Sequence, residues 1–96
     1  MAELLDDESL NKALDGLPSW HGDRSAIQRT VTVNPVEQPA LLEEMERIAR
    51  EMDHDPELDI AGEDVTIVMS THSAGGVTAL DIEYAHRVDD LVAQSG

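Results

Sequence analysis

One segment of this chain carries a strong helical pattern, and that pattern constrains the fold more than any other feature. Apolar residues recur along it at the three- and four-residue spacing of a single helix face: Leu41, Leu42, Met45, Ile48, Ala49 and Met52. Charged residues fill most of the positions between them. Pro56 disfavours helical geometry at the residue before it, so we expect the helix to end at Met52 or Asp53, with His54 and Asp55 just beyond.

Two other segments alternate between apolar and polar residues, as β-strands with one buried face do. In residues 26–33, one side of the predicted strand carries Ile27, Arg29, Val31 and Val33. In residues 65–70, one face carries Val65, Ile67 and Met69. Residues 58–60 predict a further short strand, joined to the next one by a turn at residues 61–64.

Helices are also predicted near both ends of the chain. Asp6 or Asp7 can cap a first helix that ends near Gly16. A last helix follows the glycine pair at residues 75–76, with its apolar residues at helical spacing: Val77, Leu80, Tyr84, Val88 and Leu91. The order helix, strand, helix, strand, strand, helix predicts one α+β domain over residues 1–96, an antiparallel sheet with three helices packed on one face.

The composition limits how much apolar surface this domain can bury. The 96 residues include no Phe, one Trp and one Tyr, so we expect Trp20 to anchor a core of smaller side chains. Association with a second subunit would bury more apolar area. The chain has no cysteine, and no apolar run approaches the length of a membrane span. We therefore expect a cytoplasmic protein that has no membrane partner.

The charge balance excludes one class of function. The chain has 21 acidic residues against six Lys and Arg, which gives a net charge of −15. A surface of this kind repels phosphate backbones, so direct nucleic-acid binding is not expected. The acid excess, the single lysine and the small core residues together suggest adaptation to a high-salt cytoplasm, where counter-ions screen the self-repulsion.

Two segments carry residues suited to proton transfer. The first reads Asp53-His54-Asp55-Pro56, and the second reads Thr71-His72-Ser73-Ala74-Gly75-Gly76-Val77-Thr78-Ala79-Leu80-Asp81. Side chains at the ends of helices and strands can converge on one cleft, and histidine titrates near neutral pH. Imidazole and carboxylate groups also suit metal ions, but no spacing here matches a recognised metal motif, so acid–base chemistry is preferred.

Local structural roles explain part of the same segments. Asp81 lies three residues after Thr78, which predicts a capping box at the start of the last helix. Gly75 and Gly76 are expected to serve backbone geometry. Without further context, His54 is predicted to be a cation that is stabilised by the negative end of a helix dipole. The remaining histidines have no motif around them and are predicted at the surface: His21 and His86.

With these motifs in place, the sequence resembles the pterin-4a-carbinolamine dehydratases, also called 4a-hydroxytetrahydrobiopterin dehydratases. Members carry an Asn-His-His-Pro-like segment after a long helix and a Thr-His-x-x-Gly-Gly-x-Thr-x-x-Asp segment one strand later. Both segments occur here, and the interval between them matches without a gap. Upstream, Leu17-Pro18-Ser19-Trp20 stands where the family has a Leu-x-x-Trp.

The resemblance implies a lyase that dehydrates 4a-hydroxytetrahydrobiopterin to quinonoid dihydropterin during pterin recycling. That reaction requires neither a metal nor a cofactor. By position, the resemblance implies that His54 and His72 act as the acid–base pair and that Asp81 orients them. It also implies a homodimer or homotetramer. The residues implied to bind substrate are Asp55, Pro56, Thr71 and Ser73.

Two departures from the family pattern leave a second function open. Asp55 replaces the family's second histidine, and the aromatic residue that normally follows the proline is missing. An ionised carboxylate only accepts hydrogen bonds, whereas histidine can donate, accept or carry positive charge. The alternative is a catalytically weak member that acts as a protein-binding or assembly module. Some relatives of this fold are dimerisation cofactors of transcription factors.

Overall fold

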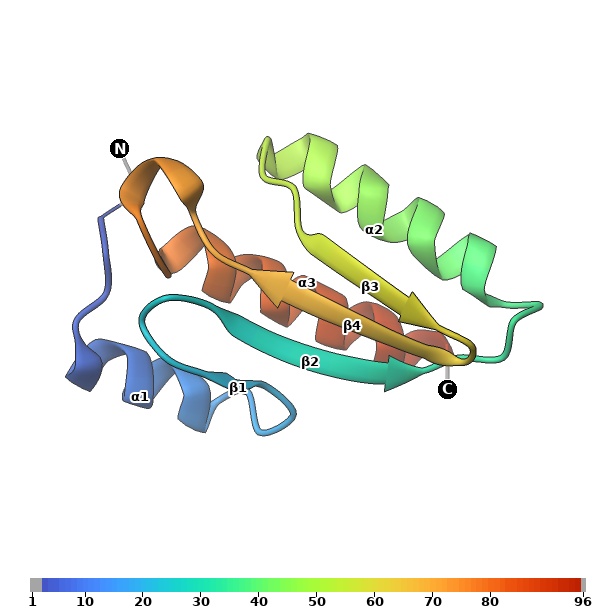
Figure 1. Ribbon diagram of the computed structural model, residues 1–96, viewed down its shortest axis with the longest axis horizontal. Coiled ribbons are helices and arrows are strands. Elements are labelled where there is room, and N and C mark those ends of the chain that lie inside the picture. Colours follow the sequence, from blue (N-terminus) through green and yellow to red (C-terminus); the bar gives the residue numbers. More distant parts are fainter. Residues whose placement is uncertain (1–2, 96) are drawn as a thin grey trace.

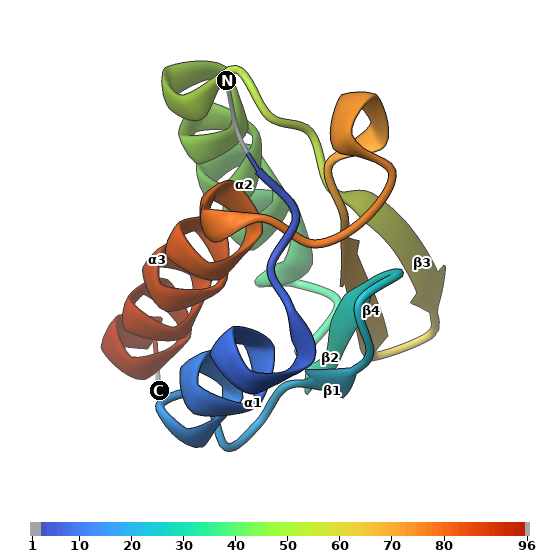
Figure 2. The same ribbon diagram turned by 90° about the vertical axis from the view of Figure 1, so that its left-hand side faces the viewer.

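A four-stranded antiparallel sheet with three helices on one face makes up the computed structural model, which describes residues 3–95. In chain order the elements are α1 (Asp7–Asp15), β1 (His21–Gly22), β2 (Ile27–Thr32), α2 (Gln38–Met52), β3 (Glu57–Ala61), β4 (Asp64–Met69), the 3-10 turn η1 (His72–Ala74) and α3 (Ala79–Ser95) (Figure 1). The strand order in the sheet is β1-β2-β4-β3. Figure 2 shows the three helices on the same side of the sheet. The predicted α+β class is confirmed.

The predicted order of elements lacks one strand, β1. This strand has only two residues, which pair with the start of β2, and an alternating pattern cannot be recognised over so short a length. Gly22 is required there because its φ is 147° and a Cβ atom would lie 2.2 Å from the carbonyl oxygen of Ala26.

The core fills the space between the sheet and the helices. In the sheet, Ile27 lies opposite Met69 and Val31 lies opposite Val65, and all four side chains are buried. Trp20 is 4% exposed, which confirms it as a core residue. The buried apolar residues of the helices are Leu10, Leu41, Met45, Ile48, Ala49, Tyr84, Ala85 and Val88.

Leu80 departs from the predicted core face of α3. Its side chain is 36% exposed, whereas the neighbouring Asp81 is fully buried. The predicted spacing starts at Val77, which precedes α3. The prediction was wrong for Leu80, which lies in the first turn of α3 with its side chain exposed.

A polar contact connects the sheet to α3 inside this apolar layer. Asp89 on α3 accepts a hydrogen bond of 2.8 Å from the Trp20 indole N–H and one of 2.5 Å from the Arg29 guanidinium. Arg29 faces the helices from β2, on the side of the strand that is otherwise apolar. Asp89 therefore pairs with the positive charge of Arg29 at a position that the alternating pattern assigns to the core.

No helix among residues 3–95 has the length and apolar character needed to cross a membrane.

Candidate functional site

The end of α2 determines where His54 lies. Asp53 adopts a left-handed backbone conformation, with φ 52° and ψ 48°, directly after the last helical residue, Met52. The next backbone N–H, that of His54, donates to the carbonyl of Ala49 at 2.9 Å. This arrangement closes the helix as a Schellman motif does and places His54 just beyond the helix end, as predicted.

His54 is hydrogen-bonded to Asp81, 27 residues further along the chain. The ring Nε2 lies 2.5 Å from Asp81 Oδ1. The Asp81 side chain has no exposed surface, while the His54 side chain keeps 10% of its surface accessible. One end of the histidine ring is therefore held by a buried carboxylate, and the ring still reaches solvent.

Asp81 also forms the predicted capping box. Its Oδ2 accepts a hydrogen bond of 2.9 Å from the backbone N–H of Thr78, and the Thr78 hydroxyl oxygen accepts one of 3.3 Å from the N–H of Leu80. The capping prediction is confirmed. One oxygen of the Asp81 carboxylate accepts a hydrogen bond from the start of α3, and the other oxygen is bonded to His54.

Thr71 and Thr78 complete the buried polar cluster. The Thr71 hydroxyl donates to Asp81 Oδ2 at 2.9 Å and lies 2.7 Å from the Thr78 hydroxyl. Thr71 is 5% exposed and Thr78 is fully buried. Thr71 was predicted to touch substrate, and in the structure its hydroxyl faces Asp81 in the interior.

His72 and Ser73 occupy the exposed turn η1, which follows β4. The backbone N–H of Thr71 donates to the Gly76 carbonyl at 2.8 Å and closes the turn. Gly75 has a φ of 81°, and a Cβ atom on Gly76 would lie 2.4 Å from the carbonyl oxygen of Arg24. The geometry requires both glycines, and the turn leaves the His72 imidazole open to solvent.

Tyr84 lies one helical turn after Asp81 on α3, and no sequence motif connects it with function. Its hydroxyl donates to the carbonyl of Met45 at 2.9 Å, and its side chain is buried. Burial, together with the negative charge of Asp55, raises the pKa of Tyr84 to about 12. Burial is the larger cause of this shift in the Tyr84 pKa, and the charge of the exposed Asp55 is the smaller one.

The structure brings only some of the predicted residues into contact. His54, Thr71 and Asp81 are joined by hydrogen bonds, and they come from the end of α2, the end of β4 and the start of α3, which meet at one end of the molecule in Figure 1. The other predicted residues are exposed or half-buried around this cluster: Asp55, Pro56, His72 and Ser73. Within residues 3–95, no group of three or more His, Cys, Asp or Glu side chains is arranged to hold a metal ion.

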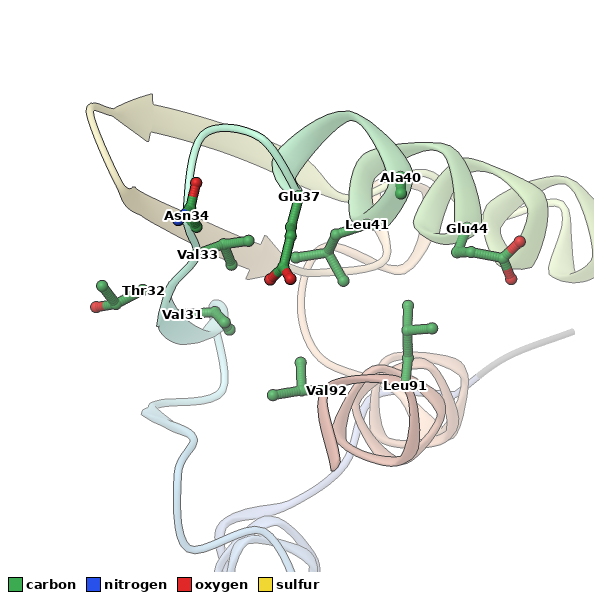
Figure 3. A pocket seen from close by; sticks show the side chains of 10 residues that line it. All are labelled: Val31, Thr32, Val33, Asn34, Glu37, Ala40, Leu41, Glu44, Leu91 and Val92. Carbon is green, nitrogen blue, oxygen red and sulfur yellow. The ribbon is translucent and has the colours of Figure 1, made fainter. Parts of the chain in front are cut away.

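A separate groove of about 450 Å³ opens at the other end of α2. Figure 3 shows its walls, which come from the end of β2, the start of α2 and the last turns of α3. Its lining residues are Val31, Thr32, Val33, Asn34, Glu37, Ala40, Leu41, Glu44, Leu91 and Val92. None of them belongs to the hydrogen-bonded cluster of His54, Thr71, Thr78 and Asp81.

Comparisons with known proteins identify the family. The family described as pterin 4 alpha carbinolamine dehydratase matches residues 3–91. A protein of Nocardia farcinica named "Putative pterin-4-alpha-carbinolamine dehydratase" is 40% identical over 93% of this chain and 95% of its own length. One of the same name from Halobacterium salinarum is 39% identical over 94% of this chain and 98% of its own.

A solved structure shares the fold. The crystal structure of a transcriptional coactivator/pterin dehydratase from Brucella melitensis superposes with a TM-score of 0.84 at 30% identity. The match covers 90% of this chain and 95% of the other. With the family match spanning residues 3–91, this chain belongs to the pterin 4 alpha carbinolamine dehydratase family.

Proposed function

We propose that this protein dehydrates 4a-hydroxytetrahydrobiopterin to quinonoid dihydropterin, with His54 and His72 as the proton-transfer groups. The observation that carries the proposal is the hydrogen bond between His54 Nε2 and the buried Asp81. A carboxylate that only accepts hydrogen bonds holds the proton of a neutral imidazole on the nitrogen facing it. Nδ1 of His54 is then the ring atom free to accept or return a proton.

Loss of water from the substrate needs two proton transfers. One group must protonate the departing hydroxyl, and another must accept a proton from the pterin ring, both near neutral pH. His54 is fixed by Asp81, whereas His72 is exposed on a short turn next to Thr71. In this proposal the substrate lies between the two histidines, and Asp55, Pro56 and Ser73 contact it.

The test is the rate at which a synthetic 4a-hydroxytetrahydropterin dehydrates, followed by absorbance with and without the purified protein. We expect acceleration above the spontaneous rate. His72→Ala should lower kcat/KM by about 100-fold or more. His21→Ala is the matched control, because His21 is also an exposed histidine but lies outside both motifs. Acceleration that survives His72→Ala unchanged contradicts the role of His72.

A protein-binding role is the second candidate, and a specific observation favours it. Asp55 stands where the resemblance implies a second histidine, so one group that could donate a proton is missing. The Brucella melitensis relative is described as a transcriptional coactivator as well as a pterin dehydratase. A folded protein that gives no acceleration at any salt concentration would favour this role over catalysis.

We also propose that the protein forms a homo-oligomer through the open edge of the sheet, at β3. Leu58 and Ile60 lie opposite Ile67 and Val65, on the face that forms the core elsewhere in the sheet. Yet their side chains are 41% and 47% exposed. A strand with an unpaired edge and exposed apolar side chains can pair with another strand, and a second copy of β3 would cover both residues.

A further inference from the structure

We propose that Thr71 is a positioning residue, which fixes the proton of His54 on Nε2 by holding the Asp81 carboxylate in place. The Thr71 hydroxyl bonds Asp81 Oδ2, and His54 Nε2 bonds Asp81 Oδ1. The two contacts use different oxygens of one carboxylate. Thr71 therefore acts on the imidazole through Asp81, and its hydroxyl need not touch a substrate.

The available hydrogens give this cluster a single direction. The hydrogen of the Thr71 hydroxyl is directed at Asp81, because a carboxylate can only accept. The contact of 2.7 Å between the two hydroxyls must then use the hydrogen of Thr78, with Thr71 as acceptor. The Thr78 oxygen in turn accepts from the backbone N–H of Leu80. The Leu80 N–H therefore donates to Thr78, Thr78 donates to Thr71, and Thr71 donates to Asp81, which only accepts.

This direction leaves one proton position for His54. Asp81 Oδ2 receives the Thr71 hydroxyl and the backbone N–H of Thr78, while Oδ1 faces His54. A ring nitrogen without hydrogen would place two acceptors 2.5 Å apart, so Nε2 carries the hydrogen. In a neutral ring, Nδ1 is then the acceptor.

Burial makes the Thr71 hydroxyl hard to replace. Asp81 and Thr78 have no exposed surface and Thr71 has 5%, so bulk water cannot substitute for the missing donor. Every buried side-chain nitrogen or oxygen among the described residues has a hydrogen-bond partner. Removing the Thr71 hydroxyl leaves the Thr78 hydroxyl without its acceptor and Asp81 Oδ2 with one donor fewer. Besides His54, only the backbone N–H of Thr78 then holds the Asp81 carboxylate, and we expect it to move enough for both neutral forms of His54 to be populated.

The first test is the tautomer of His54, measured by nitrogen-15 NMR at a pH where the ring is neutral. We expect the unmodified protein to show a single Nε2–H form. Thr71→Val, which keeps the shape and removes the hydroxyl, should give a mixture of the two forms. Thr71→Ser should restore the single form. A wild-type ring with its hydrogen on Nδ1, or a Thr71→Val ring that keeps a single Nε2–H form, overturns the proposal.

Thr30→Val is the matched control. Thr30 pairs its hydroxyl with that of Thr66 at 2.9 Å on the exposed face of the sheet, away from His54. We expect it to leave the His54 spectrum unchanged. Trp20 is the only tryptophan and lies in the core, so its fluorescence reports whether each variant is folded. Should Thr71→Val fail to fold, Thr71→Ala, which also lacks the hydroxyl, takes its place, and a single Nε2–H form in that variant overturns the proposal.

A kinetic test rests on the proposed dehydratase function. Thr71→Val should lower kcat by about tenfold or more, because a histidine in the wrong tautomer loses proton-transfer competence. KM should stay unchanged, since the hydroxyl contacts Asp81 and not the substrate. A change in KM with constant kcat would place Thr71 at the substrate and overturn its positioning role. If the protein proves not to be a dehydratase, the NMR result still decides the role of Thr71.

Discussion

The backbone conformation of Asp53 places His54 beyond the end of α2, and we expect it to lower the stability of the protein. Asp53 is the only non-glycine residue with a positive φ among residues 3–95, and it puts a negative charge at the negative end of α2. Glycine adopts this conformation without steric cost, and a helix C-terminus disfavours anions. We expect Asp53→Gly to raise the free energy of unfolding by about 0.5–1 kcal/mol.

Urea unfolding followed by Trp20 fluorescence measures this change. Asp53→Asn separates the two causes, because it removes the charge and keeps a side chain with a Cβ atom. We expect it to stabilise by a smaller amount, about 0.3–0.5 kcal/mol. A lower unfolding midpoint for Asp53→Gly would show that the Asp53 side chain contributes stability that its backbone geometry does not reveal.

Tyr84 gives the protein a predictable response to alkaline pH. Its pKa is raised to about 12 in the folded protein, by burial and by the charge of Asp55, from an ordinary value of 10.0. The stability that this shift contributes is fully present below pH 10 and is lost as the pH rises toward 12. We expect the free energy of unfolding to fall over that range, as measured by urea titrations at fixed pH.

Tyr84→Phe is the control for this response, because it removes the titrating group. It should be less stable than wild type at neutral pH, since the bond to the Met45 carbonyl is lost, but its stability should fall less between pH 10 and 12. Equal slopes for the two proteins would assign the alkaline loss to another group. Asp55→Asn should lower the pKa of Tyr84, which is the only tyrosine and can be titrated by ultraviolet absorbance.

Asp55 itself is the residue that decides between the two candidate functions. We expect Asp55→His to raise the dehydration rate if the aspartate has merely weakened the site, because histidine restores a group that can donate and accept protons near neutral pH. The assay of the synthetic pterin measures the gain. An unchanged or lower rate would mean that Asp55 has a role of its own at the site.

Local relationships between residues could be predicted from the sequence, and distant ones could not. The capping box follows from a spacing of three residues between Thr78 and Asp81, and the end of α2 follows from Pro56. The contact between His54 and Asp81 spans 27 residues and was expected only through the family resemblance. The inward direction of the Thr71 hydroxyl depends on how β4 meets α3, which no pattern along the chain encodes.

Among the elements, β3 is the edge strand whose core-facing side chains, Leu58 and Ile60, are exposed. Pairing with a second copy about a two-fold axis at Asp59 aligns the largest number of residues and brings Leu58 opposite Ile60 of that copy. The same register sets Asp59 opposite its own equivalent, and like charges directly opposite each other destabilise a strand pair. Self-association should therefore strengthen with salt.

Sedimentation at several salt concentrations tests this pairing. We expect Asp59→Asn to shift the association toward lower salt and Leu58→Lys to abolish it. Thr30→Lys is the control, because Thr30 is exposed on β2, an inner strand of the sheet. A protein that stays monomeric at all salt concentrations, or a Leu58→Lys variant that still associates, contradicts an interface at β3.

The whole molecule carries far more negative charge than its ion pairs can balance. The chain has a net charge of −15, and several of its six cations are already paired with carboxylates: Arg24, Arg29, Arg47 and Arg87. The screening length is about 10 Å at 0.1 M salt and about 3 Å at 1 M, so molar salt suppresses repulsion between carboxylates that are not in contact. We expect the free energy of unfolding to rise markedly between 0.1 and 2 M KCl.

Urea unfolding at each salt concentration measures this dependence, at protein concentrations low enough to exclude self-association. A variant with Glu43→Gln and Glu46→Gln on the exposed face of α2 should be less salt-dependent, because it removes two charges without touching the core. Equal stability at low and molar salt would contradict adaptation to high salt. The acid excess would then act on solubility, because a repulsion that salt does not relieve cannot have opposed the compact state.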